Sequence, residues 1–270
     1  MPELPEVETT RRGLLPHVVG RRIRDVIVRE PRLRWPVTAD LARRVKGERV
    51  ADIRRRGKYL LFEVGAGHVL VHLGMSGSLT LVPSGQPPRR HDHVDLALEG
   101  DATLRLTDPR RFGAVLWVRR PESHALLRGL GVEPFDDAFG GALLQRLAKG
   151  RRVPSKRFLL SGRIVTGIRN IYANESLFAA GVHPSRPAGR LSRARWDRLA
   201  IAVRATLERA LAAGGSTLRD FVGGDGRPGY FQNEYAVYGR AGEPCPACGA
   251  AIRGTRHAGR ATFHCASCQR

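Results

Sequence analysis

The sequence predicts an α+β protein of several domains, with a β-rich N-terminal part, a helical middle and a small cysteine-containing tail. Three observations predict this class. Short apolar runs separated by turn residues fill the first half, helical patterns follow residue 134, and all four cysteines lie after residue 244. A chain of 270 residues has room for more than one hydrophobic core. We place the domain boundaries at 1–133, 134–222 and 223–270.

The composition indicates a polyanionic partner. Lys and Arg total 46 against 25 acidic residues, which gives a formal net charge of +21. This charge favours nucleic acid first and an anionic membrane surface second, although arginine richness also arises from a GC-rich genome. No apolar run approaches the roughly 18–20 residues of a membrane helix, and the acidic start is unlike a signal peptide. We therefore expect a cytoplasmic protein with no membrane partner.

The β-rich half contains eight apolar runs of strand length. Alternation such as that in 94–98 is typical of strands with one buried face. Eight runs at this spacing indicate a β-sandwich or a barrel. The expected strands are Ile23–Val28, Arg49–Ile53, Tyr59–Val64, Val69–Leu73, Leu79–Val82, Val94–Leu98, Thr103–Leu106 and Val115–Val118.

The first six residues combine a potential nucleophile with two carboxylates. Removal of Met1 would make Pro2 the N-terminus, and an α-amino group with a pKa of about 7.7–8.0 is partly neutral near pH 7. A neutral amine attacks a sugar or carbonyl carbon to form an iminium. Glu3 and Glu6 are three residues apart, so a helix would place both on one face.

The same segment predicts a helix from its own end signals. Pro5 suits an early helical position, Arg11 and Arg12 suit a last turn, and Gly13 is expected to end the helix. The alternative is an ordinary capped helix in which Pro2 only governs removal of Met1, and a Met-Pro start taken alone favours it.

Three connections between expected strands carry candidate DNA contacts. In 54–58, Lys58 lies at a hairpin tip, where it forms either a solvated turn or a phosphate clamp. The loops 72–77 and 108–113 carry side chains that would fill the gap left by an extruded base. The alternative for these is ordinary packing. His91 is a candidate backbone contact or a plain surface histidine.

Two helices are expected in the middle region. Gly131–Phe135 reads as a domain boundary because glycine and proline interrupt the pattern there. Gly167–Phe178 reads as a turn that opens a helix, whose N-terminus would bind phosphate with help from Asn170, or would simply be capped. A long helix should begin at Ser192 and end at Gly214–Gly215. Its buried face would carry Trp196, Leu199, Val203, Leu207 and Leu211.

The tail predicts a metal site. Two C-x₂-C pairs supply four thiolates, which is the ligand set of a closed structural zinc site. So small a segment would depend on the ion for its folding, so we expect one Zn²⁺. The ligands are Cys245, Cys248, Cys265 and Cys268. The preceding stretch, 223–229, is either a linker or a loop that closes over an extruded base.

The blocks described above together resemble the bacterial formamidopyrimidine-DNA glycosylases, which remove oxidised purines from DNA. The resemblance begins with Met1–Thr9 and recurs in 56–62, 108–113, 167–178, 214–232 and the cysteine tail. It implies a β-sandwich domain that begins with a catalytic helix, a helix-two-turn-helix domain and a zinc-finger β-hairpin. It also implies a bifunctional glycosylase and lyase that acts through a proline iminium and successive β,δ-elimination.

The resemblance assigns roles to individual residues. It implies catalytic roles for Pro2, Glu3, Glu6, Lys58 and the finger arginine Arg260. It implies DNA contacts, among them the void-filling trio of Met75, Arg110 and Phe112, for His72, Met75, His91, Arg110, Phe112, Lys156 and Asn170. One position departs from the family, which usually has glycine where this chain has Arg169. If that position requires a positive φ or a close approach of DNA, Arg169 would strain the turn or crowd the phosphate; the alternative is that the arginine adds a phosphate contact.

Three functional classes follow. The first is an oxidised-purine glycosylase acting as a monomer on duplex DNA with a damaged base or an abasic site. The second is a relative of the endonuclease VIII type that prefers oxidised pyrimidines. The third is a zinc-containing DNA-binding protein without catalysis. The Pro2, Glu3, Glu6 and Lys58 set disfavours the third, and the Met75, Arg110 and Phe112 set favours the first.

Overall fold

The computed structural model describes residues 2–216, 229–257 and 259–270. The chain divides into two compact units, each built from two stretches of sequence. The first contains Met1–Arg128 and Leu211–Gln232, and the second contains Gly129–Ala210 and Asn233–Arg270. Each unit is described by itself.

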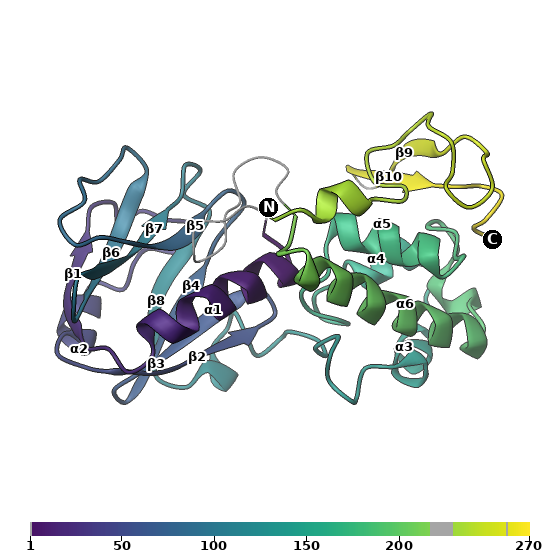
Figure 1. The fold of residues 1–270 in the computed structure, drawn as a ribbon. Coiled ribbons are helices and arrows are strands. Elements are labelled where there is room, and N and C mark those ends of the chain that lie inside the picture. The colour runs from purple at the N-terminus through teal and green to yellow at the C-terminus, as the bar shows by residue number, and fades with distance from the viewer. Residues whose placement is uncertain (1, 217–228, 258) are drawn as a thin grey trace. The chain divides into compact units, whose positions relative to one another are not determined.

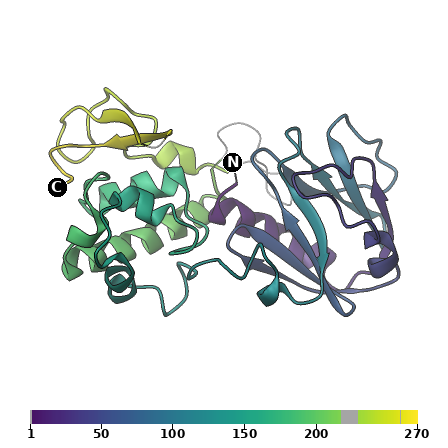
Figure 2. The same ribbon diagram turned by 180° about the vertical axis from the view of Figure 1, so that it is seen from behind.

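The first unit is a β-sandwich with a helix at its side (Figure 1). One sheet has the strand order β1-β6-β7-β5 and the other the order β2-β3-β4-β8, and every neighbouring pair is antiparallel. The two sheets are also seen from behind in Figure 2. The strands are β1 (Ile23–Val28), β2 (Val50–Arg56), β3 (Tyr59–Val64), β4 (Gly67–His72), β5 (Ser78–Val82), β6 (Asp92–Leu98), β7 (Ala102–Thr107) and β8 (Ala114–Val118).

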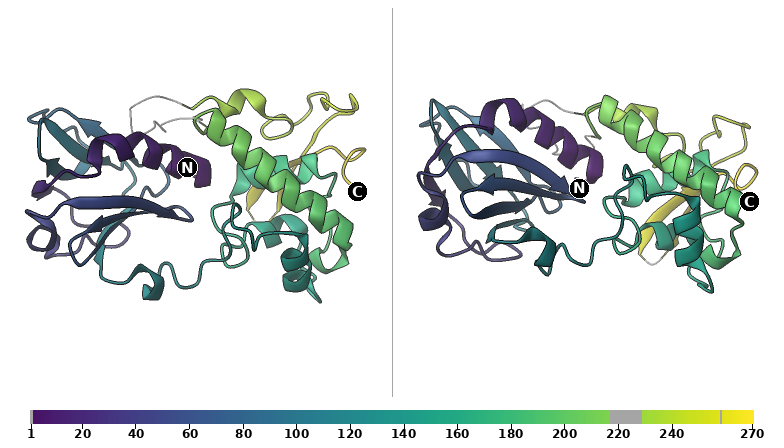
Figure 3. Two further views of the ribbon diagram at one scale, coloured as in Figure 1. Left: turned by 60° about the horizontal axis from the view of Figure 1, so that its bottom comes forward. Right: turned by 90° about the horizontal axis from the view of Figure 1, so that it is seen from below.

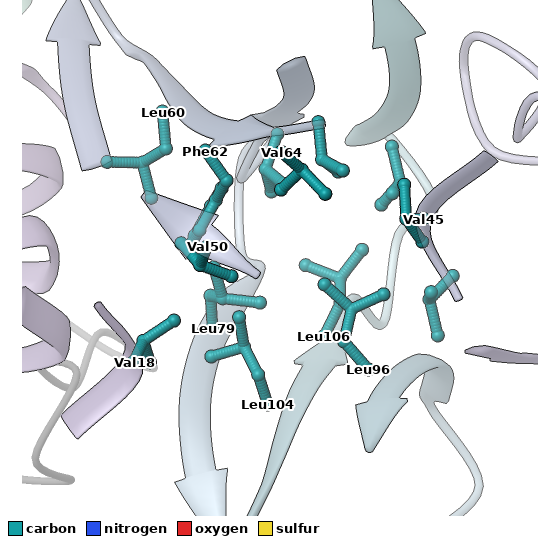
Figure 4. Packing of buried hydrophobic residues seen from close by; sticks show 14 of the residues in the cluster. Val18, Val45, Val50, Leu60, Phe62, Val64, Leu79, Leu96, Leu104 and Leu106 are labelled. Atoms are coloured by element: carbon teal, nitrogen blue, oxygen red, sulfur yellow. The ribbon is translucent and has the colours of Figure 1, made fainter. Parts of the chain in front are cut away.

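The core of this unit lies between the inner faces of the two sheets. Figure 4 shows Phe62 and Val64 of β3 on the same side of the core as Val50, and Leu104 and Leu106 of β7 facing them. All five side chains are buried. The predicted sandwich is therefore confirmed, because the alternating apolar residues of both sheets meet in one core.

Helix α1 (Leu4–Val18) continues past the point where the sequence predicted its end. Gly13 was expected to stop it, and that expectation is wrong. Leu14 and Val18 follow the glycine on the buried face and both are fully buried. Their burial outweighs the roughly 1 kcal/mol that an internal glycine costs a helix. Pro16 lies inside the helix on its exposed side.

The second unit is helical and carries a short hairpin. Its helices are α3 (Gly141–Ala148), α4 (Ser155–Leu159), α5 (Asn170–Ala179) and α6 (Arg193–Ala212), and its strands are β9 (Arg253–His257) and β10 (Arg260–His264). Figure 3 shows α6 along its length. As predicted, α6 buries Trp196, Leu199, Val203 and Leu207, whereas Leu211, which belongs to the first unit, is only partly buried.

Short elements complete the fold. Helix α2 (Leu41–Val45) lies in the first unit, and 3-10 turns occupy Pro121–Ser123, Ala188–Arg190 and Phe231–Glu234. Among the described residues, no helix is both long enough and apolar enough to cross a membrane.

Candidate active site and DNA-binding surfaces

The start of α1 is a buried cluster of the three residues predicted to carry the chemistry. Glu3 is the N-cap residue, Pro5 occupies the first turn and Glu6 is the third helical residue. Pro2 is buried, and Glu3 and Glu6 are only 4% and 2% exposed. The backbone N–H of Glu3 donates to Oε2 of Glu6 at 2.7 Å. The helix start is thus fixed by one of its own carboxylates, which satisfies a donor that the helix leaves unpaired.

Glu6 also holds the end of the segment that returns to this unit after α6. Its Oε1 accepts a hydrogen bond from the backbone N–H of Ser216 at 2.8 Å. Gly215 has a φ of 83°, and a Cβ atom there would lie 3.2 Å from the Glu6 side chain. The backbone conformation therefore favours glycine, and any other residue would also press on the Glu6 side chain. Residues 217–228, part of the predicted base-recognition region, lie outside the described residues.

Lys58 lies at the tip of the β2–β3 hairpin, as predicted. Gly57 is the first of two turn residues and has a φ of 59°, the conformation of a type II′ turn. Tyr59 follows and pairs with His72 on β4, with the two ring centroids 4.8 Å apart. Nδ1 of His72 accepts a hydrogen bond from the backbone N–H of Gly74 at 3.0 Å. Adjacent strands therefore carry Lys58 and His72 to the same end of the sheet.

The loops 73–77 and 108–113 pack directly against each other. A Cβ atom on Gly74 would lie 2.6 Å from the backbone of Phe112, and one on Gly113 would lie 2.6 Å from the carbonyl oxygen of His72. Only glycine permits so close an approach of two backbones. Met75 follows Gly74 in the chain and so lies beside Phe112 at this contact; the two residues are 37% and 38% exposed. Two predicted members of the void-filling trio thus share one surface.

The third member, Arg110, lies over Phe112. Its guanidinium carbon is 4.8 Å from the centre of the Phe112 ring, a cation–π distance. Asp108 stabilises the loop 108–113, because its carboxylate accepts hydrogen bonds from the backbone N–H groups of Gly113 at 2.7 Å and Arg110 at 3.3 Å. Burial raises the pKa of Asp108, although these hydrogen bonds act in the opposite direction. The backbone carbonyl of His91 accepts from the Asp108 N–H at 2.9 Å, so His91 adjoins this loop.

In the second unit, Lys156 and Asn170 converge on one carbonyl of the hairpin. Nζ of Lys156 lies 2.6 Å from the carbonyl oxygen of Ala261 and 2.8 Å from Oγ1 of Thr262. Nδ2 of Asn170 donates to the same Ala261 oxygen at 2.9 Å. Lys156 is only 3% exposed, and burial, aided by the charge of Arg260, lowers its pKa to about 8. Strand β10, which begins with exposed Arg260, is thereby fastened to α4 and α5.

Arg169 adopts an ordinary backbone conformation. It is the N-cap residue of α5 with φ −132° and ψ −157°, which is extended backbone. The positive φ belongs to Gly167, at 84°. An arginine at position 169 therefore introduces no backbone strain.

The four cysteines converge on a single point of the tail. Their sulfur atoms all lie within 4.8 Å of one another, and Cys245–Cys268 and Cys248–Cys265 are 3.9 and 3.5 Å apart. Thiolates at about 2.3 Å from a tetrahedral zinc ion are separated by about 3.8 Å, so the arrangement fits that ion. The residues buried around it are few (Val237, Cys245, Ile252 and Cys265), too small a core to fold unaided.

Two further groups of residues were not singled out from the sequence. Glu175, in the middle of α5, is 2% exposed and accepts the backbone N–H groups of Ala236, Val237 and Tyr238. The sequence feature that could have identified Glu175 is a single acidic residue in an otherwise apolar helix. Glu8 and Arg55 form a nearly buried ion pair at 3.2 Å in the first unit. Their signal was weaker, since both lie in segments rich in charge.

Comparison with known proteins identifies all three parts of the chain. Residues 1–115 match the formamidopyrimidine-DNA glycosylase N-terminal domain, residues 130–222 match its H2TH domain, and residues 242–270 match the zinc finger found in FPG and IleRS. With this match, the four cysteines are the site of one structural zinc ion.

Full-length relatives agree. The formamidopyrimidine-DNA glycosylases of Methylococcus capsulatus and Alkalilimnicola ehrlichii are 56% and 57% identical, each over 100% of both chains. The crystal structure of MutM (Fpg) from Thermus thermophilus has a TM-score of 0.89 at 43% identity, covering 99% of this chain and 98% of that one. Lactococcus lactis Fpg in complex with abasic-site DNA has a TM-score of 0.91 at 34% identity, with 99% of each chain covered. The chain belongs to the formamidopyrimidine-DNA glycosylase family.

Proposed function

We propose that this protein is a base-excision-repair DNA glycosylase that removes oxidised purines from duplex DNA and then cleaves the strand at the resulting abasic site. Family membership supports the glycosylase activity. Relatives support the substrate class, since the G226P mutant of Lactococcus lactis Fpg has been crystallised with DNA containing Fapy-dG, and Lactococcus lactis Fpg with DNA containing an abasic site. The strong positive charge of this chain suits a DNA partner.

One observation carries the catalytic proposal. Pro2, Glu3 and Glu6 are buried together at the start of α1, where the Glu6 carboxylate accepts a hydrogen bond from the backbone N–H of Glu3. Burying a charged group is costly, so an N-terminal segment without a function would be expected to leave its two acids exposed to solvent. After removal of Met1, the Pro2 nitrogen would be a nucleophile on a rigid element. Rigid placement near the reacting carbon is worth several orders of magnitude in rate.

The first chemical step would release the base. The lone pair of the Pro2 nitrogen forms a bond to C1′ of the damaged nucleotide, and the C1′–N9 bond breaks with its electron pair leaving on the base. The Pro2 nitrogen, now an ammonium, loses its N–H proton to the departing base and so regains a lone pair. Glu3 donates a proton to O4′ as the C1′–O4′ bond opens, and that lone pair forms the C1′=N⁺ iminium. Covalent catalysis divides one difficult displacement into two easier steps.

The second step would cleave the strand. Loss of a proton from C2′ to water breaks the C3′–O bond and expels the 3′ phosphate, and loss of a proton from C4′ to water then breaks the C5′–O bond and expels the 5′ phosphate. Lys58, at the hairpin tip, would hold a phosphate beside the lesion, with His72 on the adjacent strand as a further backbone contact. Their positive or polar groups would stabilise the leaving phosphates.

The remaining residues would bind and reshape the duplex. Met75, Arg110 and Phe112 would fill the gap left by the extruded nucleotide, since stacking side chains replace lost base stacking. His91, Asn170 and Arg260 would contact the DNA backbone. Lys156 was expected to do the same, but it is buried and its Nζ is bonded to Ala261 and Thr262, so it would act by holding the hairpin that carries Arg260, which the zinc ion would keep folded. We propose the three-part division 1–133, 134–222 and 223–270 for these tasks, in a cytoplasmic monomer.

Trapping the covalent intermediate tests the proposal. Borohydride reduces an iminium to a stable amine, so it should link this protein to an 8-oxoguanine duplex through Pro2. The variant Pro2→Gly should lose trapping and nicking but keep salt-sensitive DNA binding. No adduct from a preparation whose N-terminus is shown to be Pro2 would refute the mechanism, and binding without any cleavage would favour the DNA-binding protein without catalysis.

The second candidate is an endonuclease VIII-like preference for oxidised pyrimidines. One observation favours it, because Lactococcus lactis Fpg has also been crystallised with DNA containing an oxidised pyrimidine. Single-turnover excision from 8-oxoguanine and thymine glycol duplexes, compared side by side, separates the two. Faster excision of thymine glycol would replace the purine assignment and leave the iminium mechanism intact.

A further inference from the structure

Arg55 connects the catalytic helix to the turn that carries Lys58. It lies on β2, one residue before the end of that strand. Its Nε donates to Oε2 of Glu8 on α1 at 3.2 Å, and its Nη1 donates to the carbonyl oxygen of Gly57 at 2.9 Å. One guanidinium group therefore joins two elements of the first unit, and its side chain is only 11% exposed.

Glu8 is a fixed and permanently charged partner. Arg11 donates to both of its oxygens, at 3.0 and 2.8 Å, and Arg12 donates to Oε1 at 3.0 Å. Burial raises the pKa of Glu8, but the hydrogen bonds from Arg11 and Arg12 and the charges of Arg11 and Arg55 outweigh it, so the pKa falls to about 2. Arg11 also donates to the carbonyl oxygen of Ile53 on β2 at 3.0 Å. The helix and the strand are thus tied together at two points.

The bond to Gly57 acts directly on the direction of Lys58. The Gly57 carbonyl belongs to the peptide unit that joins Gly57 to Lys58, and a peptide unit is planar. Fixing its oxygen fixes the orientation of that plane and the place of the Lys58 Cα within it, so that the φ of Lys58 is the one backbone rotation left to set the direction of its side chain. Glycine at position 57, with a φ of 59°, would otherwise leave this turn with unusual freedom.

We propose that Arg55 and Glu8 are positioning residues, which set the direction of Lys58 relative to the Glu3–Glu6 end of α1. This inference rests on the proposed role of Lys58 in the cleavage reaction. Neither residue needs to touch DNA. Their effect is geometric, because a misplacement of about 1 Å near reacting atoms costs on the order of a hundredfold in rate.

A plain structural role would also destabilise the protein when the pair is broken, so the variants separate charge from geometry. Arg55→Lys keeps the charge but lacks a planar fork able to reach Glu8 and Gly57 together. Glu8→Gln removes the negative charge on α1 with which Arg55 pairs. The matched control is Arg54→Met, on the same strand, whose side chain is 64% exposed and pairs with Asp52 and Glu63. Arg55→Met is its direct counterpart.

Two measurements on the full-length, zinc-loaded protein test the proposal. The first is the single-turnover rate of borohydride trapping on abasic-site DNA, with the Kd for the same DNA measured in parallel. The second is hydrogen exchange of the amides of residues 57–60. Thermal unfolding shows which variants are folded at the assay temperature.

We expect Arg55→Met and Arg54→Met to weaken DNA binding to a similar extent, because each loses one positive charge. Arg55→Met should in addition slow trapping by roughly tenfold to a hundredfold. Arg55→Lys should keep wild-type affinity but share the slow trapping and the faster exchange at residues 57–60. Glu8→Gln should likewise slow trapping and speed amide exchange at residues 57–60.

Trapping rates and amide exchange in the folded Arg55 variants equal to those of Arg54→Met would overturn the proposal. If Arg55→Met does not fold, Arg55→Lys and Glu8→Gln give the same comparison. If the wild-type protein forms no adduct at all, the proposed function fails instead. Hydrogen exchange then still tests whether Arg55 orders the turn. Exchange at residues 57–60 of Arg55→Lys equal to that of the wild type would refute the ordering of the turn by Arg55.

Discussion

The carboxylate of Glu6 accepts a hydrogen bond from the backbone N–H of Glu3 on one oxygen and from the backbone N–H of Ser216 on the other, at 2.7 and 2.8 Å. Both bonds are buried. The same side chain therefore fixes the start of α1 and the residue that precedes 217–228. A displacement of either segment should therefore weaken the hydrogen bond to the other, because a carboxylate that moves toward one donor moves away from the second.

The first prediction concerns Glu6→Gln. An amide has only one acceptor oxygen, so its NH₂ group must face one of the two backbone N–H donors. We expect a loss of about 1.5–3 kcal/mol in the free energy of unfolding, the value of a hydrogen bond to a charged group. Urea unfolding measures it, and single-turnover excision should slow by about tenfold or more. Glu99→Gln, at an exposed position of the same unit, is the control. Wild-type stability of Glu6→Gln would contradict the double contact.

The second prediction concerns Phe112→Ala. Phe112 is exposed and stacked under Arg110, so truncation should cost the folded protein little. Excision of 8-oxoguanine should fall by roughly tenfold to a hundredfold, because stacking on an aromatic ring is worth about 1–3 kcal/mol. Cleavage of DNA that is already abasic should change much less. Phe135→Ala removes a similarly exposed ring from the second unit and should leave both rates unchanged. Equal losses on both substrates would argue against a void-filling role.

Local patterns made much of this fold predictable. The alternation of 94–98 predicted the core positions Val94, Leu96 and Leu98, although Asp95 on the opposite face is also buried, under Arg29 and Arg105. The paired C-x₂-C motifs predicted the cysteine cluster without knowledge of the fold. The end of α1 at Val18, rather than at Gly13, could not be predicted in this way. It depends on whether Leu14 and Val18 find a core to enter, and that core is formed by strands far along the chain.

The contacts of the candidate site were less accessible from sequence. Glu6 was recognised beside Pro2 and Glu3, but its bond to Ser216 joins residues 210 positions apart. The bonds from Lys156 and Asn170 to Ala261 span 105 and 91 positions. Such pairings follow from how whole segments pack. The residue types in a short window contain no record of them.

The third prediction concerns removal of zinc. A strong chelator should release one zinc ion per chain, as measured by atomic absorption, and the segment 242–270 should lose its structure. Its buried core is too small to remain folded alone. DNA affinity should fall toward the nonspecific range of about 10⁻⁴–10⁻⁶ M. Cys248→Ser, at an exposed ligand, should reproduce the effect in part. Unchanged DNA binding by metal-free protein would show that the hairpin is dispensable.

The fourth prediction concerns Arg169→Gly, which places glycine at the N-cap position of α5. The backbone at Arg169 is extended, so glycine relieves no strain there. We expect stability to stay equal or to fall by about 0.5–1 kcal/mol, the entropic cost of an added glycine. If Arg169 contacts a phosphate, the slope of log Kd against log salt should decrease by about one. A variant that is more stable than the wild type would indicate strain at this position.

The fifth prediction concerns pH and Lys156. Burial lowers its pKa to about 8 in the folded protein, below the value of about 10.4 expected in an unfolded chain. The folded state therefore binds the proton more weakly than the unfolded state. The resulting penalty is fully present below pH 8 and disappears as the pH rises toward 10.4, so this group makes the protein more stable across that interval, by at most about 3 kcal/mol.

Comparison with Lys156→Met isolates this effect from other groups that titrate in the same interval. The free energy of unfolding of the wild type minus that of the variant, measured by urea titration between pH 8 and 10.4, should rise with pH. Lys149→Met, at an exposed position of the second unit, should show no such change in the difference. A flat difference for Lys156→Met would mean that the buried ammonium is as well solvated by Ala261 and Thr262 as it is by water.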